Sequence, residues 1–493
     1  MTNSRLSIFA SNCNPISVAS ATFEFGIAAQ ESTESKSLWK RISSGFRDKS
    51  EKLDPSYEPI VKRLLDYRIL RHNTQTKHYT THPLIRAYYL ECLQNKPTFA
   101  QPVHRQIADY YLKSAGETPE TPILDDLKSL IEVVHHLCQA GDYDKAHDIR
   151  SERIYQGDRK VIIHVLGAYE TNLSVMQSFF PNGDISQEPQ VSDSYSQNWI
   201  LNTIGFCLMN LGCMSEAPQF YERSNAIALS REDWHNASVG YRNLAQLYAQ
   251  LGKLNSSAEA TREALKLSRR ANNRRYECDS LSIQGWAAYL QGEIEIASAA
   301  FQDAEVLERK INPDMRYLYS LRGIEHAEHL RRIEDIDYAR KVTEANLVTC
   351  EECHWLNSIG QCHRILGELD TDTDNHGSAQ FHYQEALKIA RSITYQPALI
   401  EALLAQGRWL AKQGEVAAAR RDLDEALNYA VVGGYRIYEA DIRVGLAWAH
   451  LAADNHSAAQ REAEKAWCMS KEMGYHWGQV DAKEVLEKIE TST

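Results

Sequence analysis

Two short patterns in the sequence have residue types that could bind a metal or a cofactor. Residues 350–354 read CEECH, which is the C-x-x-C-H spacing that attaches c-type haem, and Cys362-His363 follows closely. Thiolate and imidazole groups are also good ligands for zinc. Residues 370–377 read DTDTDNHG and resemble the start of a calcium loop.

Neither pattern fits its chemistry well enough to predict a cofactor. A calcium loop needs Gly at its sixth position and Glu at its twelfth, where this chain has Asn375 and Phe381. Residues 350–354 align with residues 230–234 of an earlier repeat, at a turn between repeats. We therefore expect no metal and no cofactor, and we interpret residues 370–377 as a polar loop in the longest of the repeats. An enzyme would require a metal or haem at Cys350, Cys353 and His354, and we keep it only as a rival hypothesis.

The composition favours a soluble, non-catalytic protein. The 493 residues carry a net charge of −12, no run of about 18 apolar residues is present, and no phosphate-binding G-x-x-x-x-G-K-[ST] loop occurs. Ten scattered cysteines suit a reducing compartment, and the first residues are too polar for a signal peptide, so we expect a cytoplasmic location and no membrane contact. Residues 1–96 hold 14 basic and 9 acidic residues, so a basic head precedes an acidic body.

Residues 1–96 have the pattern of a small winged-helix domain. A helix is predicted from Tyr57 to Tyr67, followed by extended runs at residues 68–71 and 77–80 and by a helix that begins at Pro83. The run LLDYRILRHNTQTKHYTTHPLIRAYY resembles the winged-helix domain of STAND (NB-ARC-like) signalling ATPases. The resemblance implies that His82 matches the histidine that senses the nucleotide in that family, although Thr81 and Pro83 replace its Met and Asp. The ATPase core is absent, so the resemblance implies that an ATPase domain or subunit is a partner.

Residues 97–182 are predicted to form a helical spacer. It contains a first helical hairpin, with Gly141 at its turn, and a long helix over residues 159–180. Residues 183–197 are polar and are predicted to be a linker or an exposed loop.

Residues 198–474 are predicted to be a repeat array. A small residue recurs inside the first helix of each unit, and a turn glycine follows seven residues later in most of them. The small residues are Gly205, Ala245, Gly285, Gly323, Gly360, Gly407 and Gly445, and the turn glycines are Gly212, Gly252, Gly292, Gly367 and Gly414. The array resembles the tetratricopeptide repeat (TPR) in a form with a period of about 40 residues. Residues 475–493 are predicted to be a capping helix and tail, and the fold class is all-α, a right-handed superhelix of helical hairpins.

Such arrays bind ligands on the concave surface of their first helices. The inward positions implied by the TPR resemblance carry polar, aromatic and cationic side chains, which suit a peptide or an acidic segment. These groove candidates are Asn202, Arg242, Gln246, Gln250, Trp286, Tyr289, Asn357, Gln361, Arg364, Arg408 and Lys412.

The sequence therefore favours an interaction scaffold or sensor module of a STAND-type system, with a peptide, protein or small inducer in the groove. The alternative is a DNA-binding regulator in which Lys62, Arg63, Arg68 and Arg71 of the winged helix contact nucleic acid and the array acts as its sensor.

Overall fold

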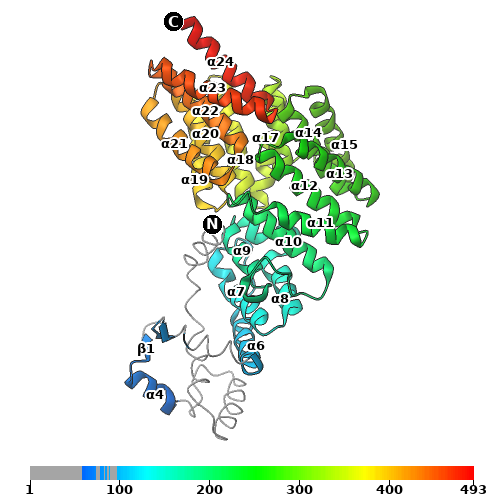
Figure 1. The fold of residues 1–493 in the computed structure, drawn as a ribbon, viewed down its shortest axis with the longest axis vertical. Coiled ribbons are helices and arrows are strands. Elements are labelled where there is room, and N and C mark those ends of the chain that lie inside the picture. Colours follow the sequence, from blue (N-terminus) through cyan, green and yellow to red (C-terminus); the bar gives the residue numbers. More distant parts are fainter. Residues whose placement is uncertain (1–57, 74–77, 83, 86–87, 89–96, 493) are drawn as a thin grey trace. The chain divides into compact units, whose positions relative to one another are not determined.

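A computed structural model of the chain describes residues 58–73, 78–82, 84–85, 88 and 97–492. The chain divides into two compact units. The N-terminal unit contains residues 1–117 and 129–149, and the repeat body contains residues 118–128 and 150–493. Figure 1 shows that helices make up nearly all of the described chain.

The described start of the N-terminal unit is a helix followed by a β-hairpin. Helix α4 (Glu58–Asp66) is followed by the antiparallel strands β1 (Leu70–Asn73) and β2 (His78–Thr81), with Leu70 paired to Thr81. A helix follows that includes residues 84 and 85. The predicted order of helix, two strands and helix is therefore present, while the rest of the expected winged helix lies outside the described residues.

The remainder of the N-terminal unit is helical. It contains α6 (Pro97–Ser114), most of α7 (Leu124–Gln139) and α8 (Tyr143–Ile149), with the turn at Gly141 as predicted. A buried pair joins α6 to α7, because Nδ1 of His104 and Nδ1 of His136 are 2.8 Å apart.

The repeat body begins with irregular helices, where the prediction of one long helix over residues 159–180 is wrong. The π-helix η2 (Arg150–Tyr155), the 3₁₀ turn η3 (Gly157–Arg159) and the π-helix η4 (Val161–Val165) precede α9 (Tyr169–Gln177) and the 3₁₀ turn η5 (Pro181–Gly183). The helix breaks at Gly167, whose φ of +57° is left-handed and which lies directly against Ile393.

Seven helical hairpins follow, and the predicted TPR-like array is confirmed. The first helices are α10 (Ser194–Asn210), α12 (Trp234–Gln250), α14 (Arg274–Gln291), α16 (Leu321–Arg332), α18 (Leu356–Asp372), α20 (Gln396–Lys412) and α22 (Arg436–Ala452). The second helices are α11 (Pro218–Ser230), α13 (Leu254–Arg270), α15 (Ile294–Ile311), α17 (Ile336–Glu352), α19 (His376–Ser392), α21 (Val416–Gly433) and α23 (His456–Met473). Helix α24 (His476–Ser492) is the predicted cap, and α10 begins inside the segment 183–197 that was predicted to be a loop.

In four of the first helices, a small residue lets an aromatic or leucine side chain of the second helix approach closely. A Cβ on Gly285 would lie 2.9 Å from the ring of Phe301, and one on Gly407 would lie 2.7 Å from Cγ of Leu423. Gly367 faces Tyr383 in the same way, at 2.7 Å. In all three pairs the glycine precedes its partner by 16 positions, so Gly367 occupies the same packing position as Gly285 and Gly407.

This packing corrects the predicted register in three repeats. Gly367 lies inside α18 and is not a turn glycine, and its counterpart in α16 is Ala327 rather than Gly323. In α22 the packing position is Ala447, which packs with Ala463, rather than Gly445, which faces Leu423 of the preceding repeat. The packing positions are then spaced by 40 or 42 residues throughout, so the array has no long repeat and no insertion. The turn after α18 is made by Asp374, with a φ of +56°, and residues 370–372 are helical rather than part of a loop.

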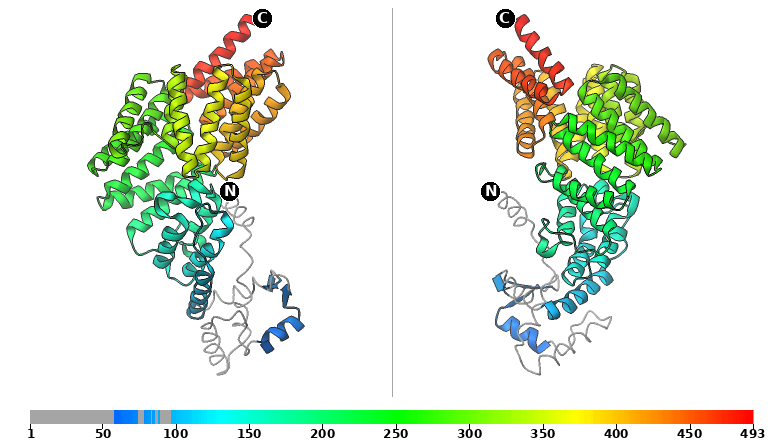
Figure 2. Two further views of the ribbon diagram at one scale, coloured as in Figure 1. Left: turned by 180° about the vertical axis from the view of Figure 1, so that it is seen from behind. Right: turned by 45° about the vertical axis from the view of Figure 1, so that its right-hand side comes forward.

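The superhelix closes on itself after one turn. The left-handed turn residues Gly212, Gly252 and Gly292, which follow α10, α12 and α14, lie against the first residues of α20, α22 and α24. Figure 2 shows these segments side by side in both views, with α24 running past the α14 hairpin. We call these the closing contacts, and they join repeats that are far apart in the sequence.

Candidate functional site

The first helices form the inner layer of the repeat body, because each packs on the next first helix as well as on its own partner. One position of this layer is polar in four of the first helices and in the cap α24. It is occupied by Asp279, Gln361, Glu401, Asp441 and Asp481, and each of these side chains contacts a charged or polar group of a neighbouring first helix. We call the surface around these five residues the inner face.

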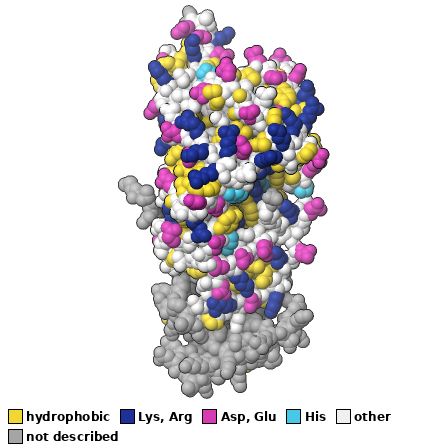
Figure 3. Space-filling view, turned by 90° about the vertical axis from the view of Figure 1, so that its right-hand side faces the viewer, with side chains coloured by type: hydrophobic (Ala, Val, Ile, Leu, Met, Phe, Trp, Pro, Cys, Tyr) yellow, Lys and Arg dark blue, Asp and Glu magenta, His cyan; other side chains and the backbone are white. Residues whose placement is uncertain are grey.

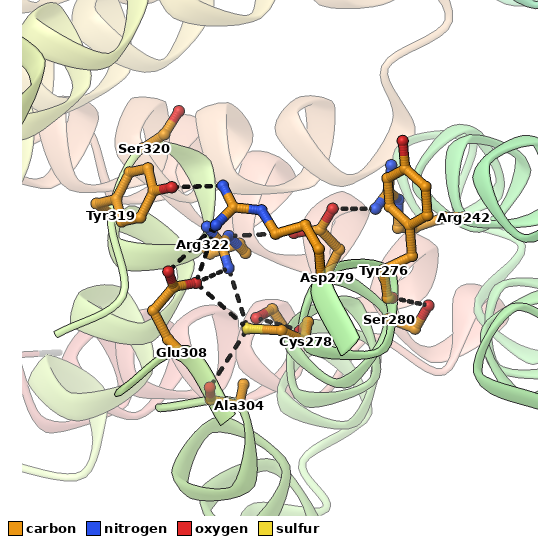
Figure 4. Close-up of polar contacts among 12 residues, drawn as sticks. Arg242, Tyr276, Cys278, Asp279, Ser280, Ala304, Glu308, Tyr319, Ser320 and Arg322 are labelled. Atoms are coloured by element: carbon orange, nitrogen blue, oxygen red, sulfur yellow. Dashed lines mark hydrogen bonds and ion pairs between the residues drawn. The ribbon is translucent and has the colours of Figure 1, made fainter. Parts of the chain in front are cut away.

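The first charged cluster of the inner face joins α12, α14, α15 and α16 (Figure 4). Arg242 forms an ion pair with Asp279, and Nε of Arg322 lies 3.4 Å from Asp279 Oδ1. Nη1 of Arg322 also donates to Oε2 of Glu308 at 2.6 Å, while Nη1 of Arg275 lies 3.1 Å from Oε1 of Glu308. Three guanidinium groups thus surround two carboxylates that have little access to solvent.

These arginines keep both carboxylates ionised. Burial alone would raise the pKa of Asp279, but Arg242, Arg322 and Arg275 together hold that pKa below its ordinary value. The pKa of Glu308 is also lowered, because the arginines outweigh the effect of burial. Burial raises the pKa of the neighbouring Cys278 thiol to about 12, so Cys278 is a hydrogen-bonding thiol and not a nucleophilic thiolate.

The second cluster joins α16 and α18. Glu328 is 3.1 Å from Arg331 and 3.4 Å from Arg364, and Arg364 also lies 3.0 Å from Glu368. Burial would raise the pKa of Glu328, but Arg331 and Arg364 lower it overall. Burial raises the pKa of Glu368, which shares the same two arginines.

The third cluster joins α16, α20, α22 and α24. Arg332 forms an ion pair of 2.7 Å with Asp481, and Arg408 lies 3.8 Å from Asp441. The hydroxyl of Tyr475 donates to Asp441 at 3.1 Å. Burial raises the pKa of Asp441 to about 7 despite the nearby guanidinium of Arg408.

The structure brings many of the predicted groove residues to this inner face. Arg242 lies in the first cluster, Arg364 in the second and Arg408 in the third. Gln361 donates to Glu401 and accepts from Arg364, and Trp286 stacks on Tyr289 with 4.8 Å between ring centroids.

The other predicted groove residues lie apart from the clusters. Asn202 accepts a hydrogen bond of 2.8 Å from Asn243, and Lys412 is exposed at the end of α20. The remaining three are half-buried: Gln246, Gln250 and Asn357. The sequence analysis missed the acidic partners Asp279, Glu401, Asp441 and Asp481. Asp279 lies seven positions before the predicted Trp286, and Glu401 lies seven positions before the predicted Arg408, whereas no groove residue was predicted on α22 or α24.

The cysteine pattern lies at a turn between repeats, as predicted. Cys350 is buried at the end of α17 and donates to Oδ1 of Asn346 at 3.2 Å, while Cys353 and His354 are exposed in the turn before α18. Within the described ranges, no group of three or more His, Cys, Asp and Glu side chains is placed to hold a metal ion.

The predicted sensor and nucleic-acid residues are exposed in the N-terminal unit. His82 caps the helix that follows it, because Nδ1 of His82 accepts a hydrogen bond of 3.2 Å from the backbone N–H of Leu84. The basic residues at the helix and hairpin are all accessible to solvent: Lys62, Arg63, Arg68 and Arg71. On the face drawn in Figure 3, basic and acidic side chains are interspersed among apolar ones. None of the described helices combines the length and the apolar character needed to span a bilayer.

Among known proteins, similarity to this chain is found in solved structures. No family model matches the chain, and no curated protein matches it. Among solved structures, it is similar to a STAND protein with a tetratricopeptide repeat sensor from Pyrococcus horikoshii, at 14% identity and a TM-score of 0.35, over 99% of this chain and 64% of that one. The chain thus spans less than two thirds of the length of that protein.

A second similar structure is the Rap conjugation gene regulator of the plasmid pLS20 in complex with the Phr* peptide. Its identity is 12% and its TM-score 0.46, over 76% of this chain and 96% of that one. A third is the Cut9–Hcn1 assembly of the APC/C, at 10% identity and a TM-score of 0.46, over 82% of this chain and 75% of that one.

Proposed function

We propose that this chain is a non-catalytic interaction and sensor module of a STAND-type signalling system, and that the inner face of its repeat body binds a peptide, a protein segment or a small inducer. One observation carries the proposal. The inner face has a nearly continuous layer of charged and amide side chains, from Arg242 on α12 to Asp481 on α24. Apolar side chains at these positions would stabilise the fold as well or better, because buried charges lose their hydration.

A buried polar layer of this kind is retained for recognition more readily than for stability. Ion pairs removed from water gain little net stability, whereas correctly placed charges select a partner of complementary charge. The partly buried Trp286, which stacks on the buried ring of Tyr289, supplies apolar contact area beside the charges. We expect ligand binding to change how the first helices pack at the closing contacts, and a separate ATPase to respond to that change.

The test uses the full chain and a pool of random pentapeptides that carry a fluorophore at the C-terminus. We expect fluorescence anisotropy to show saturable binding. We expect weaker binding by Gln361→Leu, because leucine has nearly the volume of glutamine but lacks its amide group. Gln302→Leu, on the exposed surface of the outer helix α15, is the matched control and leaves binding unchanged. If neither the peptide pool nor a small amine such as spermidine binds to the full chain, the proposal is contradicted.

The alternative function is DNA binding by the basic N-terminal unit, and a second titration separates it. A duplex of random sequence is titrated at low and moderate salt with the parent chain and with Arg68→Ala/Arg71→Ala. Binding that falls steeply with salt and weakens in the double variant would favour the DNA-binding regulator.

A further inference from the structure

Glu325 is a carboxylate of the inner layer that the ion pairs described above leave without a partner. It lies on α16 between Arg322 and Glu328, and its side chain is almost fully buried, with 4% of the residue exposed. No described residue donates a hydrogen bond to its Oε2 atom, which is itself inaccessible to solvent. An ionised carboxylate in this state costs several kcal/mol, so such groups are normally paired or protonated.

The cations nearest to Glu325 are committed to other carboxylates. Arg322 affects the charge of Glu325, but its Nη1 donates to Glu308 and its Nε faces Asp279. The next guanidinium along the inner face, Arg364, is divided between Glu328 and Glu368. If either guanidinium turned to Glu325, its present carboxylates would lose one of their two cations and keep only the other, which is Arg242, Arg275 or Arg331.

A second carboxylate, Glu401 on α20, lies close enough to Glu325 for the two charges to repel one another. Glu401 accepts hydrogen bonds from two neutral donors, the amide of Gln361 and the hydroxyl of Tyr438, and the charge of Arg364 also acts on it. Burial together with this repulsion raises the pKa of Glu325 well above its ordinary value. If both carboxylates are ionised, the region between α16, α18 and α20 therefore has more negative charge than Arg364 can neutralise, and Oε2 of Glu325 still lacks a donor.

We infer that Glu325 and Glu401 form a binding site for a cationic group of the ligand, an ammonium or guanidinium that donates to Oε2 of Glu325. Such a group supplies both the missing donor and the missing positive charge, and its own desolvation is offset by two carboxylates. The inference rests on the proposed function and deepens it, because it states which chemical group the inner face selects. The cation can belong to a basic peptide side chain or to a small aliphatic polyamine.

The experiment compares three probes on the full chain at neutral pH and low ionic strength. Two pentapeptide pools are acetylated at the N-terminus and differ only at the central residue, which is lysine or the neutral norleucine, and the third probe is spermidine. We expect the lysine pool or spermidine to bind at least ten-fold more tightly than the norleucine pool. Glu325→Gln removes that preference, whereas Glu344→Gln, an exposed carboxylate on α17, keeps it.

The unliganded stability of the same variants provides an independent readout. Gln has nearly the shape of Glu and no charge, so Glu325→Gln is expected to keep or raise the melting temperature while it abolishes the preference for cations. A residue with only a structural role would lower the melting temperature instead. If Glu325→Gln fails to fold, Glu401→Gln makes the same test, because its amide oxygen can still accept from Gln361 and Tyr438.

The outcomes separate this inference from the proposed function. Equal binding of the lysine and norleucine pools would leave groove binding intact and overturn the cation site. An unchanged lysine preference in both Gln variants would overturn it as well. If neither pool nor spermidine binds, both the cation site and the proposed function are wrong.

Discussion

The indole N–H of Trp477, at the start of α24, donates a hydrogen bond of 3.0 Å to the backbone carbonyl of Tyr289, near the end of α14. The two residues are separated by 188 positions. A related bond joins the hydroxyl of Tyr435 to the carbonyl of Met209, at 2.9 Å and across 226 positions. Carbonyls in the last turn of a helix lack a partner within that helix, and these side chains supply one from the next superhelical turn.

Trp477→Phe tests whether the closing contacts hold the superhelix together. The variant loses the hydrogen bond to Tyr289 and retains much of the packing, so we expect a loss of about 1 kcal/mol in the free energy of unfolding. Hydrogen exchange of the α24 amides should accelerate, while exchange in α18 stays unchanged. Trp467→Phe, whose ring packs within the cluster of α22, α23 and α24, is the control and should leave the α14 amides unaffected.

Substitution of two turn glycines separates backbone strain from the closing contact. Gly292 and Gly414 have φ values of +77° and +79°, so alanine at either costs about 1–2 kcal/mol for the left-handed conformation. A Cβ on Gly292 would also lie 2.4 Å from Cγ of His476, whereas nothing lies within 4 Å of one on Gly414. We expect Gly292→Ala to lower the urea midpoint clearly more than Gly414→Ala, and equal losses would mean that the contact is dispensable.

The first charged cluster predicts a large cost for removing one cation. Arg322→Met leaves Glu308 and Asp279 without their shared guanidinium in a buried setting, and we expect a loss of about 3–5 kcal/mol in the free energy of unfolding. Adding Glu308→Gln should restore part of that loss, because it removes the charge of one of the two carboxylates that share the remaining cations Arg242 and Arg275. The exposed Arg309 gives the control, because Arg309→Met should cost less than about 1 kcal/mol.

Asp441 predicts a pH dependence of stability. Its pKa is about 7 in the folded state, above the value of about 3.9 in an unfolded chain, so the folded state binds the proton more strongly between these values. Its contribution to stability is thus greatest below about pH 4 and is lost as the pH rises to about 7. The charged groups around it are Arg408, Arg332 and Asp481.

The measurement for Asp441 is the urea midpoint at pH 5 and at pH 8. We expect Asp441→Asn to reduce the fall in stability between these two pH values, because the amide does not titrate. Asp454→Asn, with a side chain that is 96% exposed, should reproduce the parent's pH profile. A steeper fall in Asp441→Asn than in the parent would contradict the assignment.

The sequence by itself determined the repeat architecture. A small residue recurs in each first helix because only a small side chain lets the second helix approach, and this requirement is local to each hairpin. Gly205, Gly285 and Gly407 were therefore identified correctly, and the inward positions Arg242, Arg364 and Arg408 are those that the TPR resemblance implies. The register failed at Gly367 because one glycine can serve either a helix crossing or a turn, and only the contact with Tyr383 distinguishes the two.

The tertiary structure decided how the inner face is paired and how the superhelix closes. Asp279 meets Arg322, and Trp477 meets Tyr289, across stretches of chain whose approach depends on the summed twist of several repeats. No pattern within one repeat encodes that sum, because a small rotation at each interface accumulates along the array. For the same reason, the sequence shows that Glu325 lies on α16, but only the packed array shows that it is buried beside Glu401 without a donor.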